Sequence, residues 1–341
     1  MSTRHTSCLV TGGASFIGSH LAEALVRSGA KVRVADDLSS GVRRHLSGIE
    51  KEIEFLEGDL RNIEFTRKAV QGCEHVFHLA ADHGGRGYIH THPANCAVNM
   101  ALDNLVFHCA AQSGVRRITF ASSACVYPTD LQQEDPLLLK EDMVCFRKRG
   151  GAFADETYGW AKLMGELSLQ AHHLQFGISA ASVRISTAYG PRENESHAII
   201  ALIAKAFVGQ NPFEIWGDGE QTRGFTYVDD VVAGLMLAGE HITDGGAVNI
   251  GGSAFISLNQ VAGMIFRELG WEPPDGIRHL ADQPVGVKHR ALDGSYALSR
   301  LGWKPEVPLE EGLRRTIRWY CQTHDRKQVA QTLKQQLNSR K

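Results

Sequence analysis

A glycine-rich loop near the N-terminus constrains the fold of this chain most strongly. The apolar run 8–10 leads into a loop from Gly12 to Gly18, and apolar residues at helical spacing follow. A tight glycine turn between a strand and a helix brings backbone N–H groups to a pyrophosphate, and the last glycine lets the helix pack closely on the strand. The next apolar run, 31–35, ends at Asp36, where a carboxylate binds adenosine ribose hydroxyls and repels a 2'-phosphate. This order predicts a dinucleotide-binding unit that takes NAD rather than NADP.

Short apolar runs rich in β-branched residues alternate with helical patterns through the first half of the chain. The predicted strands are 8–10, 31–35, 53–56, 75–80 and 118–121, and the predicted helices are 17–28, 62–71 and 99–113. Strands separated by single helices require crossover connections, which are right-handed in parallel sheets. We therefore predict an α/β fold with a Rossmann-like doubly wound parallel sheet.

The second half of the chain has shorter predicted strands. A long helix over 155–176 and a strand over 181–185 complete the predicted NAD-binding domain, residues 1–185. We predict a smaller C-terminal α/β substrate-binding domain over 186–322, with some segments interleaved, and a polar tail over 323–341 that forms a frayed or exposed helix.

Composition and charge exclude several classes of protein. The 36 Lys and Arg nearly balance the 38 Asp and Glu, so no net field favours nucleic acid or an anionic membrane. The seven cysteines have scattered spacings without a C-x-x-C, and the histidines show no H-E-x-x-H, so neither disulfides nor a metal site is predicted. The start lacks a leader pattern and no apolar run reaches about 18 residues. We expect a cytoplasmic protein without membrane or nucleic-acid partners.

Several motifs carry a family resemblance. The glycine loop, together with Tyr158-x-x-x-Lys162, resembles the extended short-chain dehydrogenase/reductase superfamily, namely its nucleotide-sugar epimerases and dehydratases. Three further segments most resemble the GDP-mannose 3,5-epimerase group: LAADHGGRG at 79–87, ASSACVYP at 121–128 and WGDGEQTR at 216–223. The resemblance implies NAD as the cofactor, a nucleotide sugar as the substrate and a homodimer as the assembly.

The spacing of Tyr158 and Lys162 makes chemical sense of the resemblance. Four residues apart on a helix, the two side chains project from one face, where the ammonium lowers the pKa of the phenol from about 10 toward the working pH. Tyr158 is then a general base for a sugar hydroxyl, and NAD+ accepts the hydride. Ser123 shares the hydrogen bond of that hydroxyl. Cys125, two residues further on, is expected to face the same side of an extended strand end.

Cys125 is the candidate for a second chemical step. In the resembling dehydratases a Glu occupies this position and removes the C5 proton, and in the 3,5-epimerase group a Cys does comparable acid/base work. A 4-keto sugar has acidified C3 and C5 hydrogens, which gives a thiol a proton to remove. A buried packing role is the alternative reading of this cysteine.

The motif positions predict two sets of binding residues. Arg223 and Arg290 match family positions that hold the nucleotide phosphates, a task that suits a guanidinium. The predicted cofactor-binding residues are Gly12, Ser15, Phe16, Ile17, Gly18, Asp36, Asp59, Leu60, Ala80, Ala81, Asn99, Ser122, Tyr158 and Lys162. The predicted substrate-binding residues are Gly84, Gly85, Arg86, Ser123, Cys125, Thr187, His197, Trp216, Arg223 and Arg290.

Departures from the family pattern narrow the reaction. Ala124 stands where 4,6-dehydratases carry an Asp, so ordinary 4,6-dehydration is disfavoured. The 3,5-epimerase group places a Lys after its Tyr-Gly-Pro, whereas the first Lys here is Lys205, so the role of opposite-face acid passes to His197, Glu195 or another group. Two binding positions also differ, with Ser15 in the glycine loop and Thr187 at a position where relatives use Asn.

These observations predict an NAD-dependent nucleotide-sugar epimerase that works through a transient 4-keto sugar with proton exchange at C5 or C3. One alternative is a dehydratase that eliminates water across C5 and C6. A second is plain 4-epimerisation, which needs only rotation of the ketone and no cysteine. The last is a non-catalytic protein that binds NAD or a nucleotide sugar, for which Ser15 and Thr187 are the motivation.

Overall fold

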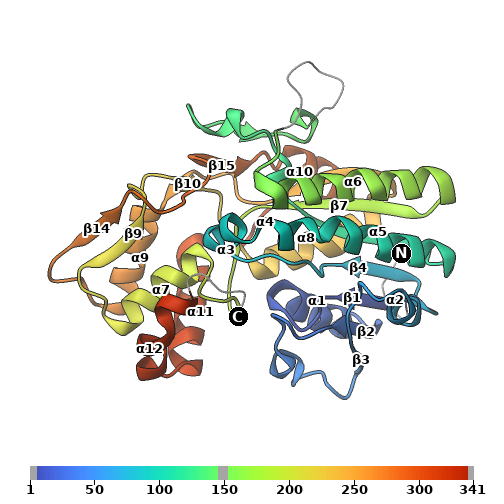
Figure 1. The fold of residues 1–341 in the computed structure, drawn as a ribbon, viewed down its shortest axis with the longest axis horizontal. Coiled ribbons are helices and arrows are strands. Elements are labelled where there is room, and N and C mark those ends of the chain that lie inside the picture. Colours follow the sequence, from blue (N-terminus) through green and yellow to red (C-terminus); the bar gives the residue numbers. More distant parts are fainter. Residues whose placement is uncertain (1–5, 145–152, 337–341) are drawn as a thin grey trace.

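A seven-stranded parallel sheet forms the larger part of the molecule (Figure 1). The computed structural model describes residues 6–144 and 153–336, so Cys145 and the last five residues of the predicted tail lie outside the described part. The strands in spatial order are β12 (Asp244–Ile250), β7 (Ser179–Ile185), β5 (Arg117–Ser123), β4 (His75–His78), β1 (Ser7–Thr11), β2 (Lys31–Asp36) and β3 (Ile53–Glu57). Every neighbouring pair is parallel, which confirms the predicted doubly wound sheet.

The order of the strands reverses direction between β1 and β4. From β1 the chain adds β2 and β3 on one side, and it then returns to add β4, β5, β7 and β12 on the other side. In such open sheets, ligands bind outside the carboxyl ends of the strands at this switch point. The topology therefore places the end of β1 and the glycine loop next to the end of β4.

Helices cover both faces of this sheet, and β1 shows how its residues divide between them. Cys8 and Val10 are fully buried in the core shared with the helices α1 and α8, whereas Leu9 is buried in the core on the opposite face, beside α5. This is the alternation expected when both faces of a strand are covered. The helices of the first half are α1 (Phe16–Arg27), α2 (Ile63–Val70), α3 (Arg86–Thr91), α4 (Pro93–Ala97), α5 (Asn99–Gln112) and α6 (Glu156–Phe176).

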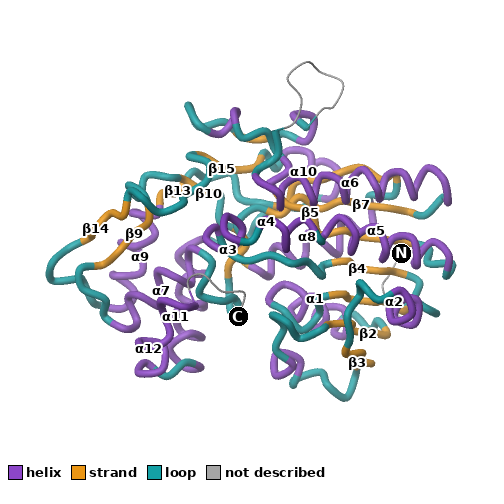
Figure 2. The backbone as a smooth tube through the Cα atoms, in the orientation of Figure 1, coloured by secondary structure: helices purple, strands orange, loops and turns teal. Residues whose placement is uncertain are grey.

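Most of the remaining elements form the smaller part, which packs beside the carboxyl edge of the sheet (Figure 2). Three small sheets are present, with β13-β10-β15-β6, β11-β8 and β14-β9 as neighbours. Their strands are β6 (Leu138–Leu139), β8 (Ala188–Tyr189), β9 (Phe213–Trp216), β10 (Thr222–Arg223), β11 (Thr226–Tyr227), β13 (Ile256–Ser257), β14 (Ile277–Leu280) and β15 (His289–Leu292). Of the remaining helices, α7 (Ala198–Val208), α9 (Leu258–Leu269), α11 (Leu309–Thr323) and α12 (Arg326–Gln336) belong to the smaller part. Helices α8 (Val228–His241) and α10 (Ser295–Leu301) instead pack on the large sheet, α8 against β5 and β7 and α10 against β12.

The end of β4 differs from the sequence prediction. The strand stops at His78, two residues before the predicted end, because the next two backbone N–H groups bind a side chain instead of a neighbouring strand. The Thr11 hydroxyl accepts hydrogen bonds from the N–H of Leu79, at 3.0 Å, and of Ala80, at 3.1 Å. The same oxygen lies 2.8 Å from Nδ1 of His78. Thr11 thus ties the ends of β1 and β4 together at the switch point.

The predicted exposed tail is partly buried. Helix α12 packs against α7, and its Val329 and Leu333 are only 3% and 7% exposed. The tail is polar in composition, but its two buried apolar residues lie four apart and so share one face of a helix. Among residues 6–144 and 153–336, no helix has the length and apolar character needed to cross a membrane.

Candidate active site

Two adjoining cavities lie at the carboxyl edge of the large sheet, and every predicted site residue lines one of them. The larger lies where the smaller part meets this edge, and residues between 12 and 102 line the other. The larger has a volume of about 770 Å³ and the smaller about 160 Å³, and Gly12 and Ser15 line both. Asp36, Asp59, Leu60, Ala80 and Asn99 line the smaller cavity, and the other predicted cofactor and substrate residues line the larger. The fold therefore brings together positions that are spread over most of the chain.

The glycine loop forms a closely packed turn between β1 and α1. Gly12 has a φ of 65°, and a Cβ on it would lie 2.9 Å from the backbone N of Ala80. A Cβ on Gly18 would lie 2.2 Å from the carbonyl oxygen of Gly12. Both positions therefore require glycine. Ser15 has ordinary extended geometry, with a φ of −86°, and its hydroxyl makes no capping hydrogen bond to α1.

Asp36 closes this loop from the end of β2. One oxygen of its buried carboxylate accepts a hydrogen bond of 2.9 Å from the N–H of Ala14, and the other accepts one of 2.9 Å from the N–H of Leu38. The loop at Gly12–Gly18 and the carboxylate at the end of the second strand thus have the arrangement that holds a dinucleotide. These residues fit NAD. Asp59, also predicted to contact the cofactor, is half-buried and forms an ion pair with Arg61.

Tyr158 and Lys162 lie one turn apart on α6 and are both buried. Burial raises the pKa of the Tyr158 phenol well above its ordinary value, and a side-chain hydrogen bond with Ser123 opposes this shift. In the protein alone the pKa of this phenol is therefore raised, contrary to the predicted shift toward the working pH. The ammonium lies 4.5 Å from the ring centroid of Phe120 and 6.0 Å from that of Tyr158. Burial also lowers the pKa of Lys162, while the carboxylates of Asp103 and Glu166 oppose that change.

Cys125 reaches the cavity by a different route from the one predicted. The strand ends at Ser123, and residues 124–126 form a 3₁₀ turn that the Ser123 hydroxyl caps by accepting a 3.1 Å hydrogen bond from the N–H of Cys125. The expectation of an extended strand end is therefore wrong, because the serine hydroxyl satisfies the first N–H of a turn instead. The carbonyl of Cys125 accepts a hydrogen bond of 2.8 Å from the N–H of Asp155, which fixes the turn against the start of α6.

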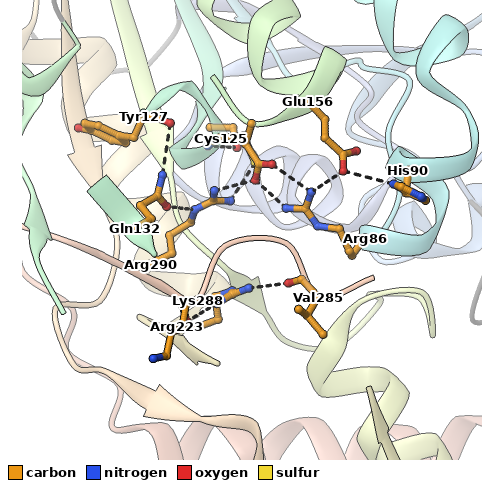
Figure 3. Close-up of polar contacts among 12 residues, drawn as sticks. Arg86, His90, Cys125, Tyr127, Gln132, Glu156, Arg223, Val285, Lys288 and Arg290 are labelled. Carbon is orange, nitrogen blue, oxygen red and sulfur yellow. Dashed lines mark hydrogen bonds and ion pairs between the residues drawn. The ribbon is translucent and has the colours of Figure 1, made fainter. Parts of the chain in front are cut away.

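An ionic cluster, made of Arg86, Asp155 and Arg290, surrounds the thiol of Cys125. Arg86 from α3 and Arg290 from β15 approach each other beside Cys125 (Figure 3). The Asp155 carboxylate accepts hydrogen bonds of 2.6 and 3.1 Å from Arg86 and one of 2.7 Å from Arg290. Arg290 also donates to the sulfur of Cys125 at 3.1 Å. Burial opposes ionisation of Asp155, but Arg290 and Arg86 together hold the pKa of its carboxyl well below the usual range.

Arg223 lies beside this cluster without an acidic partner of its own among the described residues. Strand β10 pairs in parallel with β15 so that Arg223 is opposite Arg290. Its guanidinium donates to three backbone carbonyls, at 2.7 Å to Thr222, 3.1 Å to Val285 and 3.4 Å to Lys288. Figure 3 shows the contacts with Val285 and Lys288. Burial, reinforced by Arg290 and Arg86, lowers the pKa of Arg223 to about 9. A partly buried cation that donates only to carbonyl oxygens is well suited to an anionic ligand.

Comparison with known proteins places this geometry in a family. Residues 8–251 match the model of the NAD dependent epimerase/dehydratase family. The chain belongs to that family. It is 34% identical over 316 residues to a GDP-mannose 3,5-epimerase of Oryza sativa subsp. japonica, which covers 91% of this chain and 80% of that protein. It is 28% identical over 318 residues to a UDP-glucose 4-epimerase of Mycolicibacterium smegmatis, which covers 92% of this chain and 97% of that protein.

A solved structure gives the same result. A double mutant of the dTDP-glucose 4,6-dehydratase DesIV from Streptomyces venezuelae, crystallised with NAD bound, has a TM-score of 0.84 and 26% identity, over 93% of this chain and 97% of that one. The predicted superfamily and fold are confirmed. This member of the epimerase/dehydratase family is therefore an NAD-dependent enzyme.

Several functional candidates of this family member were missed at the level of sequence. Asp155 binds two arginines but precedes the helix without any motif to mark it. Gln132 accepts a hydrogen bond of 2.7 Å from Nε of Arg290, and Glu193 lies buried against His197. Each acts through a partner far along the chain or within a loop, so no periodicity or spacing signals it. His83 lies within the LAADHGGRG segment at 79–87, but only the fold shows that its ring is next to that of Tyr158.

Proposed function

We propose that this enzyme is an epimerase of a nucleotide sugar, acting through a transient 4-keto sugar with proton exchange at C5 or C3. The observation that carries the proposal is the meeting of Tyr158, Lys162 and Cys125 in one cavity, with the cysteine thiol next to the guanidinium of Arg290. A dehydrogenase alone needs no acid/base group beyond the Tyr and Lys pair. A thiol in the same cavity gives a second group that can act on the oxidised sugar.

Each residue has a defined task in this proposal. Bound NAD+ supplies a hydride acceptor for C4 and a positive charge that favours the ionised form of the phenol. Tyr158 takes the proton of the C4 hydroxyl, Lys162 stabilises the resulting charge, and Ser123 shares the hydrogen bond. Cys125 then removes the hydrogen next to the ketone, leaving an enolate that is reprotonated before C4 is reduced again.

The charges of the cavity support a nucleotide-sugar substrate. Arg223 and Arg290 lie on paired strands at the smaller part, and the Asp155 carboxylate is shared by Arg290 and Arg86. The Glu156 carboxylate also forms an ion pair with Arg86, at 3.3 Å. Three guanidinium groups therefore lie near two carboxylates, which leaves one positive charge for a pyrophosphate. The GDP-mannose 3,5-epimerase of rice, similar over 91% of this chain, is named for such a substrate.

Incubation with GDP-, UDP-, dTDP- and CDP-hexoses and hexuronates in D2O tests the proposal, with proton NMR and mass spectrometry as the readouts. We expect an isomer of one substrate that carries deuterium at C5 or C3. A Cys125→Ala variant is expected to lose that label. An isomer formed without deuterium would overturn the proposal in favour of plain inversion at C4.

A second candidate function is elimination of water across C5 and C6 after Cys125 removes the C5 proton. The thiol of Cys125 in the cavity supports it, because loss of the C5 proton beside the 4-ketone is also the first half of this elimination. Ala124 supplies no acid where the resembling dehydratases place one, so the proton for the leaving C6 hydroxyl would come from another group. In the same incubation, a product lighter than its substrate by one water would identify this reaction.

A further inference from the structure

Two histidine rings line the larger cavity together with Tyr158 and Cys125. His83 follows β4, and its ring centroid is 5.6 Å from that of Tyr158, with the two planes at 87°. The His197 ring, just before α7, has its centroid 5.6 Å from that of His83. The segment that carries His197 also follows the strand β8 at the smaller part, whereas Cys125 follows β5 in the large sheet. The two candidate proton carriers therefore enter the cavity from different parts of the fold.

A buried carboxylate fixes the ring of His197. Oε1 of Glu193 lies 3.0 Å from Nδ1 of His197, and the side chain of Glu193 is only 3% exposed. The other oxygen, Oε2, is buried without a hydrogen-bond partner among the described residues. Burial raises the pKa of Glu193, and His197 opposes the shift. A carboxylate on Nδ1 selects the tautomer in which that nitrogen carries the proton, so Nε2 becomes the nitrogen that exchanges protons in the cavity.

The backbone around this pair is held from two sides. The N–H of Gly85 donates a 3.1 Å hydrogen bond to the Ser196 hydroxyl, and a Cβ on Gly85 would lie 1.7 Å from the Ser196 carbonyl oxygen. On the other side Arg192 has a φ of 74° and forms an ion pair of 2.6 Å with Glu23 on α1. The loop that carries His83 and Gly85 is therefore held in contact with the segment that precedes α7.

The other candidates for this task are engaged elsewhere. Glu195 accepts a hydrogen bond of 2.8 Å from the Tyr320 hydroxyl of α11 and lies 3.7 Å from His324. Lys205 donates a 2.7 Å hydrogen bond to the carbonyl of Glu214 on β9. The first contact directs Glu195 toward α11, and the second directs Lys205 toward β9.

We propose that His197 is the second acid/base residue of this enzyme, acting on the sugar face opposite Cys125, with Glu193 as its positioning residue. The inference rests on the proposed epimerisation. Cys125 as the thiolate takes the proton next to the 4-ketone, and the C–H electron pair becomes the enolate. The imidazolium of His197 then gives its Nε2 proton to the other face of that carbon, the ketone re-forms, and the ring is left neutral. Solvent afterwards restores the proton to His197 and removes the one on Cys125.

Deuterium exchange in the holoenzyme separates the two faces. The substrate that the wild-type enzyme converts is incubated in D2O with His197→Asn, His197→Gln and Cys125→Ala, each loaded with NAD, and substrate and product are followed by proton NMR. We expect both His197 variants to put deuterium into the recovered substrate while forming product at least about 100-fold more slowly, because Cys125 still removes and returns a proton on its own face. Cys125→Ala is expected to leave the substrate unlabelled.

His241 provides a matched control. It is exposed at the end of α8 and does not line either cavity, so His241→Asn is expected to keep wild-type exchange and turnover. Glu193→Gln is expected to lower kcat with little change in KM and to shift the pH profile of kcat, and Glu193→Asp to restore part of the rate. Loss of folding alone would not give that pattern.

The outcomes distinguish this inference from the proposed function. Product formed at the wild-type rate by His197→Asn and His197→Gln would overturn the role of His197, as would variants that leave the recovered substrate unlabelled. If the wild-type enzyme itself introduces no deuterium, the proposed epimerisation at C5 or C3 fails, and the inference fails with it for that separate reason.

Discussion

The cofactor wall and the substrate wall of the site are held by different forces. On the cofactor side, the glycine loop packs closely, and the N–H of Gly12 donates a 2.8 Å backbone hydrogen bond to the carbonyl of Ala35 at the end of the neighbouring strand. The Asp36 carboxylate adds hydrogen bonds that it accepts from the backbone N–H groups of Ala14 and Leu38. On the substrate side, Arg86 and Asp155 are 69 residues apart in sequence, and Arg290 and Asp155 are 135 apart, yet both pairs form short ion pairs. The first wall depends on local geometry and the second on long-range charge.

The two walls are therefore expected to differ in how well they tolerate amino-acid substitution. Backbone hydrogen bonds at strand ends survive most side-chain replacements, whereas a buried ion pair loses its balance when either partner is removed. The substrate wall is therefore the place where single substitutions separate folding, binding and chemistry from each other.

Removing the Tyr158 hydroxyl should give the largest effect. Tyr158→Phe is expected to lower kcat by about 10³-fold or more, because general acid/base groups contribute on the order of 10²–10⁴ in rate. NAD binding, measured by calorimetry, should persist because the glycine loop and Asp36 are untouched. A Phe variant with wild-type turnover would remove Tyr158 from the mechanism.

Neutralising Asp155 should destabilise the substrate wall. Asp155→Asn is expected to lower the free energy of unfolding in urea by about 3–5 kcal/mol, since it removes the counter-charge of the buried Arg290 and leaves Arg86 with Glu156 alone. The matched control is Glu54→Gln. The Glu54 side chain is 54% exposed and forms a 2.7 Å ion pair with Arg33, which this substitution breaks. That change should cost less than about 1 kcal/mol. Equal losses of unfolding free energy in the two variants would show that the buried cluster stabilises the fold no more than an exposed ion pair does.

The stability of wild type and that of Asp155→Asn should respond differently to acid. The pKa of Asp155 is below its unfolded value, so its contribution to stability is complete above about pH 4, the ordinary range of an Asp, and is lost as the pH falls through the folded value. The difference in unfolding free energy between wild type and Asp155→Asn is therefore expected to be full at pH 6 and to narrow toward pH 3. A difference that stays constant over this range would mean that the charge of Asp155 is not what holds the arginines.

Substitution of Arg223 tests substrate binding while the ionic cluster of Arg86, Asp155 and Arg290 stays intact. Arg223→Gln is expected to weaken nucleotide-sugar binding by about 10- to 100-fold, the equivalent of roughly 1.5–3 kcal/mol for a hydrogen bond to a charged group. NAD affinity should not change. The exposed Arg300→Gln on α10 is the control, and equal substrate affinities of the two variants would contradict a phosphate contact at Arg223.

The cofactor wall should show the smallest response. Ser15→Gly restores the family glycine, and because Ser15 has an extended backbone and no capping hydrogen bond, NAD affinity should change by less than about 1 kcal/mol. Fluorescence titration of NADH measures it. A change of 100-fold in either direction would mean that the Ser15 side chain contacts the cofactor directly.

Much of the fold and half of the site could be read from local patterns. The glycine loop, Asp36 and the Tyr158-Lys162 spacing are short-range signals whose geometry follows from a strand, a turn and a helix. The approach of Cys125 was misjudged because a serine hydroxyl ended the strand in a 3₁₀ turn, which period-two alternation does not foresee. The pKa of Tyr158 was misjudged because burial is a property of the packed protein.

The sequence by itself determined the parallel sheet, the dinucleotide loop and the pair on α6, because apolar periodicity and turn chemistry act over a few residues. Only the tertiary structure decided that Asp155 joins two arginines beside Cys125 and that Glu193 holds His197 near His83. Those contacts arise where crossover connections bring distant segments to the same edge of the sheet. Charge and burial at such a meeting point depend on every segment present, and no single stretch of sequence contains them.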